Sequence, residues 1–400
     1  MYLDLALIAG AILAFSSIAG LVEKSWVSGP IVFVLFGFLI GPRVLDLLSL
    51  QMQRETLKTL VELTLALVLF NDAAGADLKI LRREAGIPIR MLGIGLPLTL
   101  LLGFGAGLLL LSELSVIEVA ILATILAPTD AALGQAVLKE QAIPANLRQG
   151  LNFESGLNDG LCVPILLVLL TLAIEKASHA SGYQLALSYL VTELGIGLLV
   201  GVILAAFGVY LLRFNREQGW LSTNWLQLTV FALAITTFAT AQSLGGSGFI
   251  ATFCGGLLFG HLLKGQSADL LRSGEGIGDA FELITWVLFG AAVAGKALPN
   301  FTWPILGYAV LSLTLLRMLP IYISLSGTGL STEGKLFLGW FGPRGLATIV
   351  FTIMVININL PHGDTIITTA SFTVMLSIIL HGISAKPWVD RWVRNQKQAE

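Results

Sequence analysis

Apolar stretches long enough to cross a lipid bilayer recur along this 400-residue chain, and they constrain its fold more than any other feature. A helix needs about 20 mostly apolar residues to span the hydrocarbon core, where only helices and closed barrels can satisfy their own backbone groups. Hydrophobic residues make up 56% of the chain and charged residues 12%, against roughly 25% charged in a soluble domain. We therefore predict an all-α protein that crosses a membrane many times, and we disfavour a soluble multidomain enzyme.

Charged residues and Pro/Gly pairs divide the apolar sequence into 13 predicted membrane segments. The first begins near the N-terminus, carries Asp4 and lacks a basic start, so we interpret it as a spanning helix and not as a cleaved signal peptide. Residues 1–385 would form one transmembrane domain, and residues 386–400 a short basic cytoplasmic tail. The segments lie roughly at residues 2–21, 28–42, 58–75, 88–111, 116–138, 151–174, 184–212, 224–243, 246–263, 280–298, 302–325, 335–357 and 364–384.

Lysines and arginines are distributed unevenly between the two sets of loops. With the N-terminus outside, the inside regions carry 16 of the 23, the outside regions carry five, and Arg317 and Arg344 fall within segments. Because positive residues gather on the cytoplasmic side, this distribution predicts an outside N-terminus and a cytoplasmic C-terminus. The expected location is the cell membrane, either plasma or bacterial inner membrane.

Two of the predicted segments are interrupted at their middles. Pro128-Thr129-Asp130 breaks segment 116–138, and Gly342-Pro343-Arg344-Gly345 breaks segment 335–357. Proline kinks alone are tolerated in membrane helices, but two breaks in corresponding places are typical of a transporter binding site.

The breaks also reveal a repeat. Segments within residues 88–174 and 302–384 have similar lengths, and each set carries the break in its middle member. The sets are offset by seven segments, which is an odd number, so one enters the membrane opposite to the other. This pattern predicts an inverted repeat with two crossing broken helices.

Ionisable residues deep in these segments are candidate functional residues. A charge near the bilayer centre costs about 2.5–3.5 kcal/mol on insertion scales, so such residues usually have partners and a function. The candidates are Asp72, Asp130, Glu154, Asp159, Arg317 and Arg344.

The stretch FESGLNDG, residues 153–160, places four polar side chains on two helical stripes. Ser155 and Asp159 are four residues apart and share one face, as do Glu154 and Asn158 on the adjoining stripe. A hydroxyl and a carboxylate suit a small cation or a proton, whereas the other stripe suits contacts with the scaffold. Thr129 and freed carbonyls at the first break would add oxygen ligands.

Several of these residues have two open interpretations. Glu154 is expected to pair with Arg317. Arg344 either balances helix dipoles at the break or influences the protonation of Asp159. Asp130 is either a cation ligand or a partner of a helix end. Asp72 either lines a pathway or caps the end of segment 58–75.

The motifs APTDAAL and NFESGLNDG, with 24 residues from Asp130 to Glu154, and the motif GWFGPRGLATIVF resemble the sodium/proton exchangers. The similarity is to the electroneutral, Asn-Asp branch of the monovalent cation:proton antiporters, and it covers nearly the whole chain. It implies a 13-helix fold with a dimerisation domain and a mobile core domain, and therefore a homodimer in the lipid bilayer. Gly195 and Gly201, in GIGLLVG, suit either a dimer interface or packing within one protomer.

The resemblance also assigns roles to the candidate site. It places the transported cation, Na+ or another monovalent ion, at Asp159 in competition with H+. The relatives often carry an acidic residue at the end of segment 58–75, and FNDA leaves open whether Asn71 or Asp72 takes that place. The remaining assignments are Asn158 beside Asp159, site oxygens or their supports at Thr129, Asp130 and Ser155, and supporting charges at Glu154, Arg317 and Arg344.

We therefore predict a secondary transporter that exchanges a cation for a proton one for one, and not an enzyme. Neither a cofactor nor a nucleic acid is expected, and Cys162 and Cys254 read as buried apolar residues. No histidine falls in the proposed site. The alternatives are potassium/proton exchange, a cation channel, and an intramembrane aspartyl protease suggested by Gly276-Ile277-Gly278-Asp279, which we interpret as a helix start at the edge of segment 280–298.

Overall fold

The computed structural model of the chain describes most of its length. The predicted segment 116–138 is described only as far as Asp130. The orientation stays a prediction, and six of the residues counted for it lie outside the described residues: Lys24, Lys79, Arg82, Arg83, Lys139 and Lys264. The described residues are 2–22, 27–48, 54–76, 86–130, 143–178, 183–220, 222–263, 267–356, 358 and 360–399.

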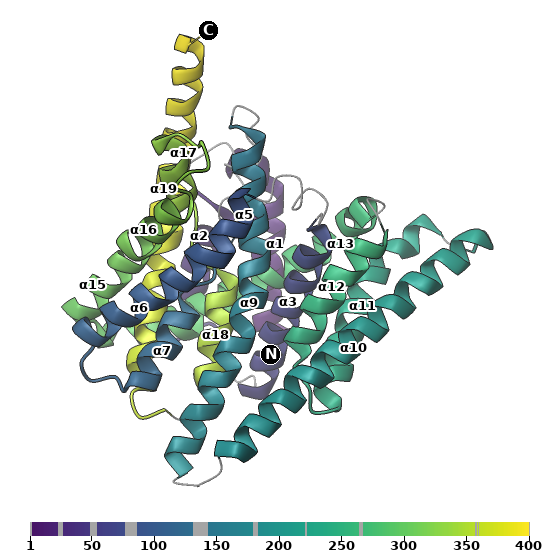
Figure 1. Ribbon diagram of the computed structural model, residues 1–400, viewed down its shortest axis with the longest axis horizontal. Coiled ribbons are helices and arrows are strands. Elements are labelled where there is room, and N and C mark those ends of the chain that lie inside the picture. The colour runs from purple at the N-terminus through teal and green to yellow at the C-terminus, as the bar shows by residue number, and fades with distance from the viewer. Residues whose placement is uncertain are drawn as a thin grey trace. The chain divides into compact units, whose positions relative to one another are not determined.

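All of the regular structure in these described residues is helical, as predicted, and each of the 13 predicted segments contains a helix (Figure 1). The first half holds α1 (Tyr2–Val22), α2 (Gly29–Ile40), α3 (Arg54–Gly75), α5 (Gly86–Arg90), π-helical η1 (Met91–Gly95), α6 (Leu96–Leu110), α7 (Val116–Ile125), α9 (Ala145–Ser178) and α10 (Tyr183–Glu217). The second half holds α11 (Thr223–Ser243), α12 (Gly248–Leu263), α13 (Ser267–Leu288), π-helical η3 (Phe289–Ala294), α14 (Gly295–Ala297), 3₁₀-helical η4 (Leu298–Asn300), α15 (Trp303–Leu313), α16 (Leu315–Ser324), α17 (Thr332–Trp340), α18 (Leu346–Ile356) and α19 (Gly363–Ala399).

Seven helical stretches in the described residues have the length and apolar composition to cross a bilayer. Five further apolar helices are shorter, and two of these, α7 and α18, are halves of the interrupted segments. Short half-helices are expected there because each break ends the helix near mid-segment. The seven stretches are Tyr2–Val22, Gly86–Leu110, Ala145–Ile174, Val191–Glu217, Gly276–Ala294, Trp303–Ser324 and Gly363–Trp392.

The predicted segment 302–325 is not one continuous helix. Thr314 has φ −111° and ψ −97°, and it separates α15 from α16. The hydroxyl of Thr314 donates to the carbonyl of Val310, a contact typical of bent membrane helices. The bend lies three residues before Arg317, so it helps to set the direction of that side chain.

One interpretation of the sequence was wrong. Gly276-Ile277-Gly278-Asp279 does not start a helix, because α13 begins nine residues earlier at Ser267. The polar residues before Gly276 continue the helix instead of capping it, and the helix therefore extends beyond the apolar segment 280–298. The last helix is also longer than its apolar segment: α19 continues through residues 386–399. The division between a transmembrane domain and a cytoplasmic tail stays a prediction.

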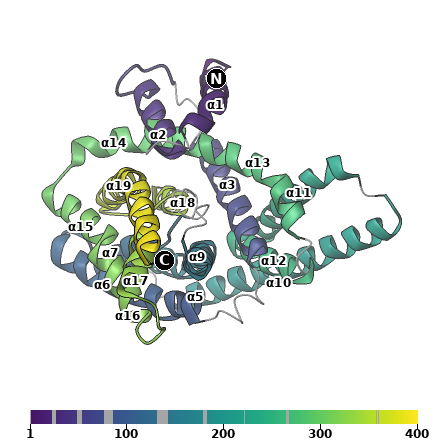
Figure 2. The ribbon, with the colours of Figure 1, turned by 90° about the horizontal axis from the view of Figure 1, so that it is seen from above.

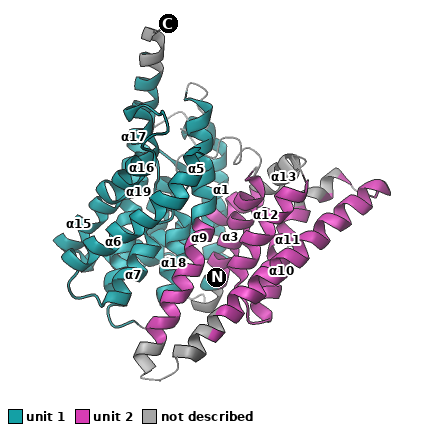
Figure 3. Cartoon of the chain, in the orientation of Figure 1, with its two compact units in different colours: residues 1–58, 84–158, 283–400 teal, residues 59–83, 159–282 magenta. Residues whose placement is uncertain are grey.

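The chain forms two compact units, drawn in separate colours in Figure 3. Helix α9 passes from the first unit into the second between Asn158 and Asp159. The first unit comprises Met1–Lys58, Glu84–Asn158 and Leu283–Glu400, and the second comprises Thr59–Arg83 and Asp159–Glu282.

In the second unit, α10 packs tightly against α12. A Cβ on Gly197 would collide with the carbonyl of Ser247, and a Cβ on Gly201 would collide with that of Ala251. Gly195 faces open space. Two of these glycines therefore serve packing within the protomer, since small residues let membrane helices approach closely.

In the first unit, α18 lies beside α19, and α19 also packs along α15 (Figures 1 and 2). Helices α6 and α7 pack on one another, and α16 packs on α6 and η1. This bundle contains both interrupted segments, and it positions the candidate site.

Candidate functional site

The two interrupted segments meet at their breaks. Helix α7 ends at Ile125 and α18 begins at Leu346, so residues near 128 and 343 are unwound. The backbone N–H of Asp130 donates to the carbonyl of Pro343 at 2.8 Å. This contact confirms that the two broken segments cross where the sequence is interrupted.

Asp130 contacts the start of α18. Its Oδ2 accepts a hydrogen bond from the backbone N–H of Leu346 at 2.9 Å. A carboxylate at a helix N-terminus satisfies a free N–H group and interacts favourably with the helix dipole. Gly345 makes this approach possible, because a Cβ there would collide with the Asp130 carboxylate. Asp130 is thus a helix-end partner, and its role as a cation ligand stays a prediction.

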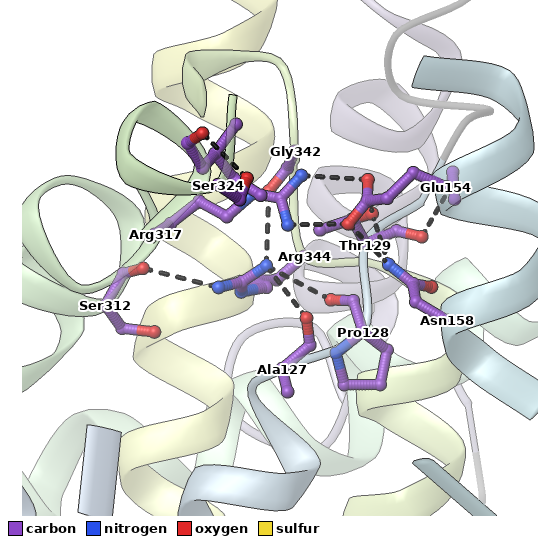
Figure 4. Close-up of polar contacts among 12 residues, drawn as sticks. Ala127, Pro128, Thr129, Glu154, Asn158, Ser312, Arg317, Ser324, Gly342 and Arg344 are labelled. Atoms are coloured by element: carbon purple, nitrogen blue, oxygen red, sulfur yellow. Dashed lines mark hydrogen bonds and ion pairs between the residues drawn. The ribbon is translucent and has the colours of Figure 1, made fainter. Parts of the chain in front are cut away.

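Arg344 makes the reciprocal contact at the end of α7. Its Nη1 lies 3.3 Å from the carbonyl oxygens of both Ala127 and Pro128, and its Nη2 lies 3.4 Å from that of Ser312 (Figure 4). The side chain is 1% exposed. Ala127 and Pro128 follow the end of α7 at Ile125, and the guanidinium lies where the negative end of that helix dipole points. These contacts are compatible with charge balance at the break, and the role of Arg344 stays a prediction.

Thr129 connects the first break to α9. Its hydroxyl donates to Glu154 Oε2 at 3.1 Å and accepts from Asn158 Nδ2 at 2.7 Å, while its carbonyl accepts from Ser155 Oγ at 2.6 Å (Figure 4). All four side chains are buried. The two predicted stripes of α9 therefore converge on one residue. Any cation that used the Thr129 carbonyl would share it with the Ser155 hydroxyl.

Arg317 pairs with Glu154, as the sequence predicted. Its two terminal nitrogens lie 2.6 and 2.8 Å from the two carboxylate oxygens, and both side chains are fully buried. The two parallel bonds are the strong, geometrically specific form of such a pair. Gly342 provides the space, because a Cβ there would lie only 2.5 Å from Arg317 Nε.

The side chain of Asn158 is held through its amide nitrogen. Its Nδ2 bonds both Thr129 and, at 3.2 Å, Glu154 Oε1, whereas its buried Oδ1 has no hydrogen-bond partner among the described residues. Asp159, the next residue of α9, is 6% exposed. The network around Thr129 thus fixes the helix immediately before Asp159.

The predicted contribution of segment 58–75 falls on two neighbouring residues with different environments. Asp72 is exposed on α3, whereas Asn71 is half-buried and its Oδ1 is buried without a hydrogen-bond partner in the described structure. Asn71 also faces α13, at Gly278. Neither residue is thereby assigned to the site, and the choice between them stays open.

Two residues of α19 that the sequence did not single out contact the second break. Ser377 Oγ accepts a hydrogen bond from the backbone N–H of Arg344 at 2.7 Å, and His381 Nε2 lies 2.8 Å from the carbonyl oxygen of Trp340. Both are buried in an otherwise apolar segment. The sequence feature that could have identified them is their four-residue spacing, because polar side chains so spaced share a helix face.

Crossing half-helices that exchange charged contacts, beside a helix with the two buried carboxylates Glu154 and Asp159, are the arrangement typical of broken-helix membrane transporters. Sequence comparison agrees over almost the whole chain. Residues 9–391 match the family described as sodium/hydrogen exchanger, transmembrane, and the chain belongs to this family.

Individual relatives have low sequence identity to this chain. The chain is 25% identical over 276 residues to the K(+)/H(+) antiporter NhaP of Alkalimonas amylolytica, covering 68% of this chain and 47% of that protein. It is 23% identical over 261 residues to the K(+)/H(+) antiporter NhaP2 of Shewanella oneidensis, covering 65% and 45%. The chain therefore spans about half the length of the curated relatives that it matches.

A solved structure shares the fold. The sodium proton antiporter MjNhaP1 from Methanocaldococcus jannaschii, solved at pH 8, superposes with a TM-score of 0.74 and covers 95% of this chain and 98% of its own. The two sequences are 22% identical. The predicted antiporter fold is therefore confirmed.

Proposed function

We propose that this protein exchanges a monovalent cation for protons across the membrane by alternating access. Na+ is the favoured cation, with Li+ as a second substrate. K+ is the alternative, and the names of the two curated relatives favour it. The proposal rests on family membership and on the network that holds α9 at the crossing.

In this proposal, Asp159 binds either the cation or the proton, never both. Binding of either ion neutralises the carboxylate, so the occupied site can cross the low-dielectric interior. A bare carboxylate would be costly to move. Competition for one group then couples the two gradients without another energy source. Ser155 and Thr129 would supply further oxygen ligands to the cation, and Asp72 would line its pathway.

The network that holds α9 up to Asn158, the residue before Asp159, carries the proposal. Glu154 is paired with Arg317, and Asp130 contacts the N-terminus of α18. These two carboxylates have structural partners within the crossing. Because Asn158 is an amide, the Asn-Asp pair contributes one titratable group, which favours an electroneutral one-for-one cycle.

The test is cation-driven proton movement in proteoliposomes. Asp159→Asn removes the shared carboxylate, so we expect exchange with Na+, Li+ and K+ to fall to the level of empty vesicles. The matched control is Asp364→Asn, because Asp364 is an exposed acid at the start of α19 and should leave exchange unchanged. Full exchange by the Asp159→Asn variant would refute the assignment.

The same assay separates the alternatives. Wild-type protein supplied with each cation in turn identifies the substrate from its apparent affinities. Uphill movement of one ion driven by the other establishes antiport. Downhill flux alone would indicate a cation channel instead.

The arrangement in the membrane is also part of the proposal. An outside N-terminus, a cytoplasmic C-terminus and a homodimer in the cell membrane follow from the charge distribution and the family resemblance. Labelling of single cysteines placed at the two termini of a Cys162→Ala/Cys254→Ala background, in intact cells, would report both orientations.

A further inference from the structure

The unwound residues between α17 and α18 require partners for their backbone groups. Gly342–Arg344 lie between the helical hydrogen bonds of Phe341 to Phe337 and of Ile349 to Gly345, and these unwound residues are buried. Buried backbone groups without partners are costly, so a neighbouring element has to supply them. Helix α19 supplies one of these partners with Ser377, and its His381 adds a contact to the carbonyl of Trp340, which also accepts from the N–H of Gly342.

These two side chains hold the break at both of its ends. Ser377 Oγ accepts from the N–H of Arg344, and His381 Nε2 lies 2.8 Å from the carbonyl oxygen of Trp340, the last residue of α17. The hydroxyl and the ring are themselves linked, with Ser377 Oγ 3.3 Å from His381 Nδ1. The His381 ring also stacks on the Trp340 indole, with centroids 5.0 Å apart.

The contacts extend from α19 to the end of α7. Ser377 fixes the backbone of Arg344, and the Arg344 guanidinium reaches the carbonyls of Ala127 and Pro128. Thr129 and Asp130 follow directly in the chain. The position of the candidate ligand oxygens at the first break therefore depends on how α19 holds the second break.

We propose that Ser377 and His381 are positioning residues, which hold the second break so that Arg344 orders the first. The neutral ring with its proton on Nε2 fits this role. Nε2–H then donates to Trp340, and the Ser377 hydroxyl, which already accepts from Arg344, donates to Nδ1 at 3.3 Å, while the Ser377 carbonyl, 2.9 Å from Nδ1, receives no proton from the ring.

A positively charged ring is the competing form. It could donate to Trp340 and also to the Ser377 carbonyl, which lies 2.9 Å from Nδ1. However, the ring is 1% exposed, and the break already holds the buried guanidinium groups of Arg344 and, against Gly342, Arg317. The nearby carboxylates, Glu154 and Asp130, are engaged elsewhere. Burial and like charge both oppose a further cation, so His381 acts as a clamp and not as a pH sensor.

Paired serine variants test the clamp. Ser371 is as buried as Ser377 and lies on the same helix, but among the described residues its hydroxyl bonds only the carbonyl of Ile367. Ser377→Ala should raise the apparent KM for the cation about tenfold, as loss of supporting contacts typically does, with a maximal rate within about twofold of wild type. Ser371→Ala should match wild type. Equal KM values for the two variants would overturn the proposal.

Histidine variants test the neutral form. His381→Gln retains a donor and an acceptor, whereas His381→Leu retains neither. We expect His381→Gln to keep the wild-type KM and pH profile, and His381→Leu to behave as Ser377→Ala. If His381→Gln moves the pH midpoint of exchange by about half a unit or more, the ring titrates and the clamp assignment fails.

This effect on transport rests on the proposed exchange function, so a second measurement is independent of activity. In protein labelled with ¹⁵N-histidine, the signal missing from His381→Gln belongs to His381. We expect the neutral Nε2–H form between about pH 6 and 8. A protonated ring in that range would refute the inference, whereas absence of exchange by the wild type would refute only the proposed function.

Discussion

At the scale of single residues, the site is a set of buried polar groups with matched partners. Glu154 and Arg317 are fully buried and doubly bonded, and Thr129 accepts or donates three hydrogen bonds. Removing one partner of such a pair leaves an uncompensated charge, which is more costly than replacing both. The residues are therefore energetically coupled, and single substitutions overstate the contribution of the pair.

The first prediction concerns this coupling. Glu154→Gln and Arg317→Met should each destabilise the protein by about 3–5 kcal/mol, because each leaves one buried charge unpaired. The double variant should recover much of the loss. Thermal unfolding in detergent, arranged as a double-mutant cycle, measures it. Additive losses in the double variant would mean that the two groups do not interact.

At the scale of elements, the crossing is a reciprocal exchange of charges between two half-helices. Asp130, from the break after α7, contacts the N-terminus of α18, and Arg344, from the break before α18, contacts carbonyls just beyond the C-terminus of α7. The glycines of Gly-Pro-Arg-Gly have a steric reason: Gly342 leaves room for Arg317, and Gly345 for Asp130. The two glycines of the motif thus leave room for neighbouring side chains, and its arginine supplies the charge.

The second prediction follows from that space. Gly345→Ala should displace the Asp130 carboxylate from Leu346, at a cost of about 1.5–3 kcal/mol for a lost charge-assisted hydrogen bond. Thermal unfolding and exchange activity should both fall. The control is Gly105→Ala in α6, since a Cβ there meets nothing within 4 Å. A Gly345→Ala protein as stable as the control would contradict the steric explanation.

At the scale of the whole molecule, two compact units share one helix, α9, which carries FESGLNDG across their boundary. Close helix packing within the second unit uses glycines that the sequence also offered for a dimer interface. Gly197 and Gly201 contact the backbone of α12, whereas Gly195 faces open space. Packing within the protomer therefore accounts for Gly197 and Gly201, and a dimer interface at Gly195 stays a prediction.

The third prediction uses this separation. Gly201→Val should prevent close packing of α10 on α12 and reduce the yield of folded protein, because the collision involves the rigid backbone of Ala251. Gly195→Val should fold normally. Size-exclusion chromatography of fluorescent fusions compares both. A folded but monomeric Gly195→Val protein would place the dimer interface at Gly195, and a well-folded Gly201→Val protein would contradict the packing argument.

The sequence alone determined the helical membrane fold, the 13 segments, the two breaks and the pairing of Glu154 with Arg317. These follow from local rules: lipid requires internally bonded backbone, and buried charges require partners. It did not reveal the bend at Thr314, the extension of α13 to Ser267, or the contacts of Ser377 and His381.

Only the tertiary structure decided which partner each polar group has. The sequence left Asp130 between cation ligand and helix-end partner, and the approach of α18 assigned its contact. It gave no role to His381, because a lone histidine in an apolar segment has no sequence pattern that names its partner. Hydrogen-bond partners far apart in the chain depend on how helices cross, and that geometry is set by packing across the whole bundle.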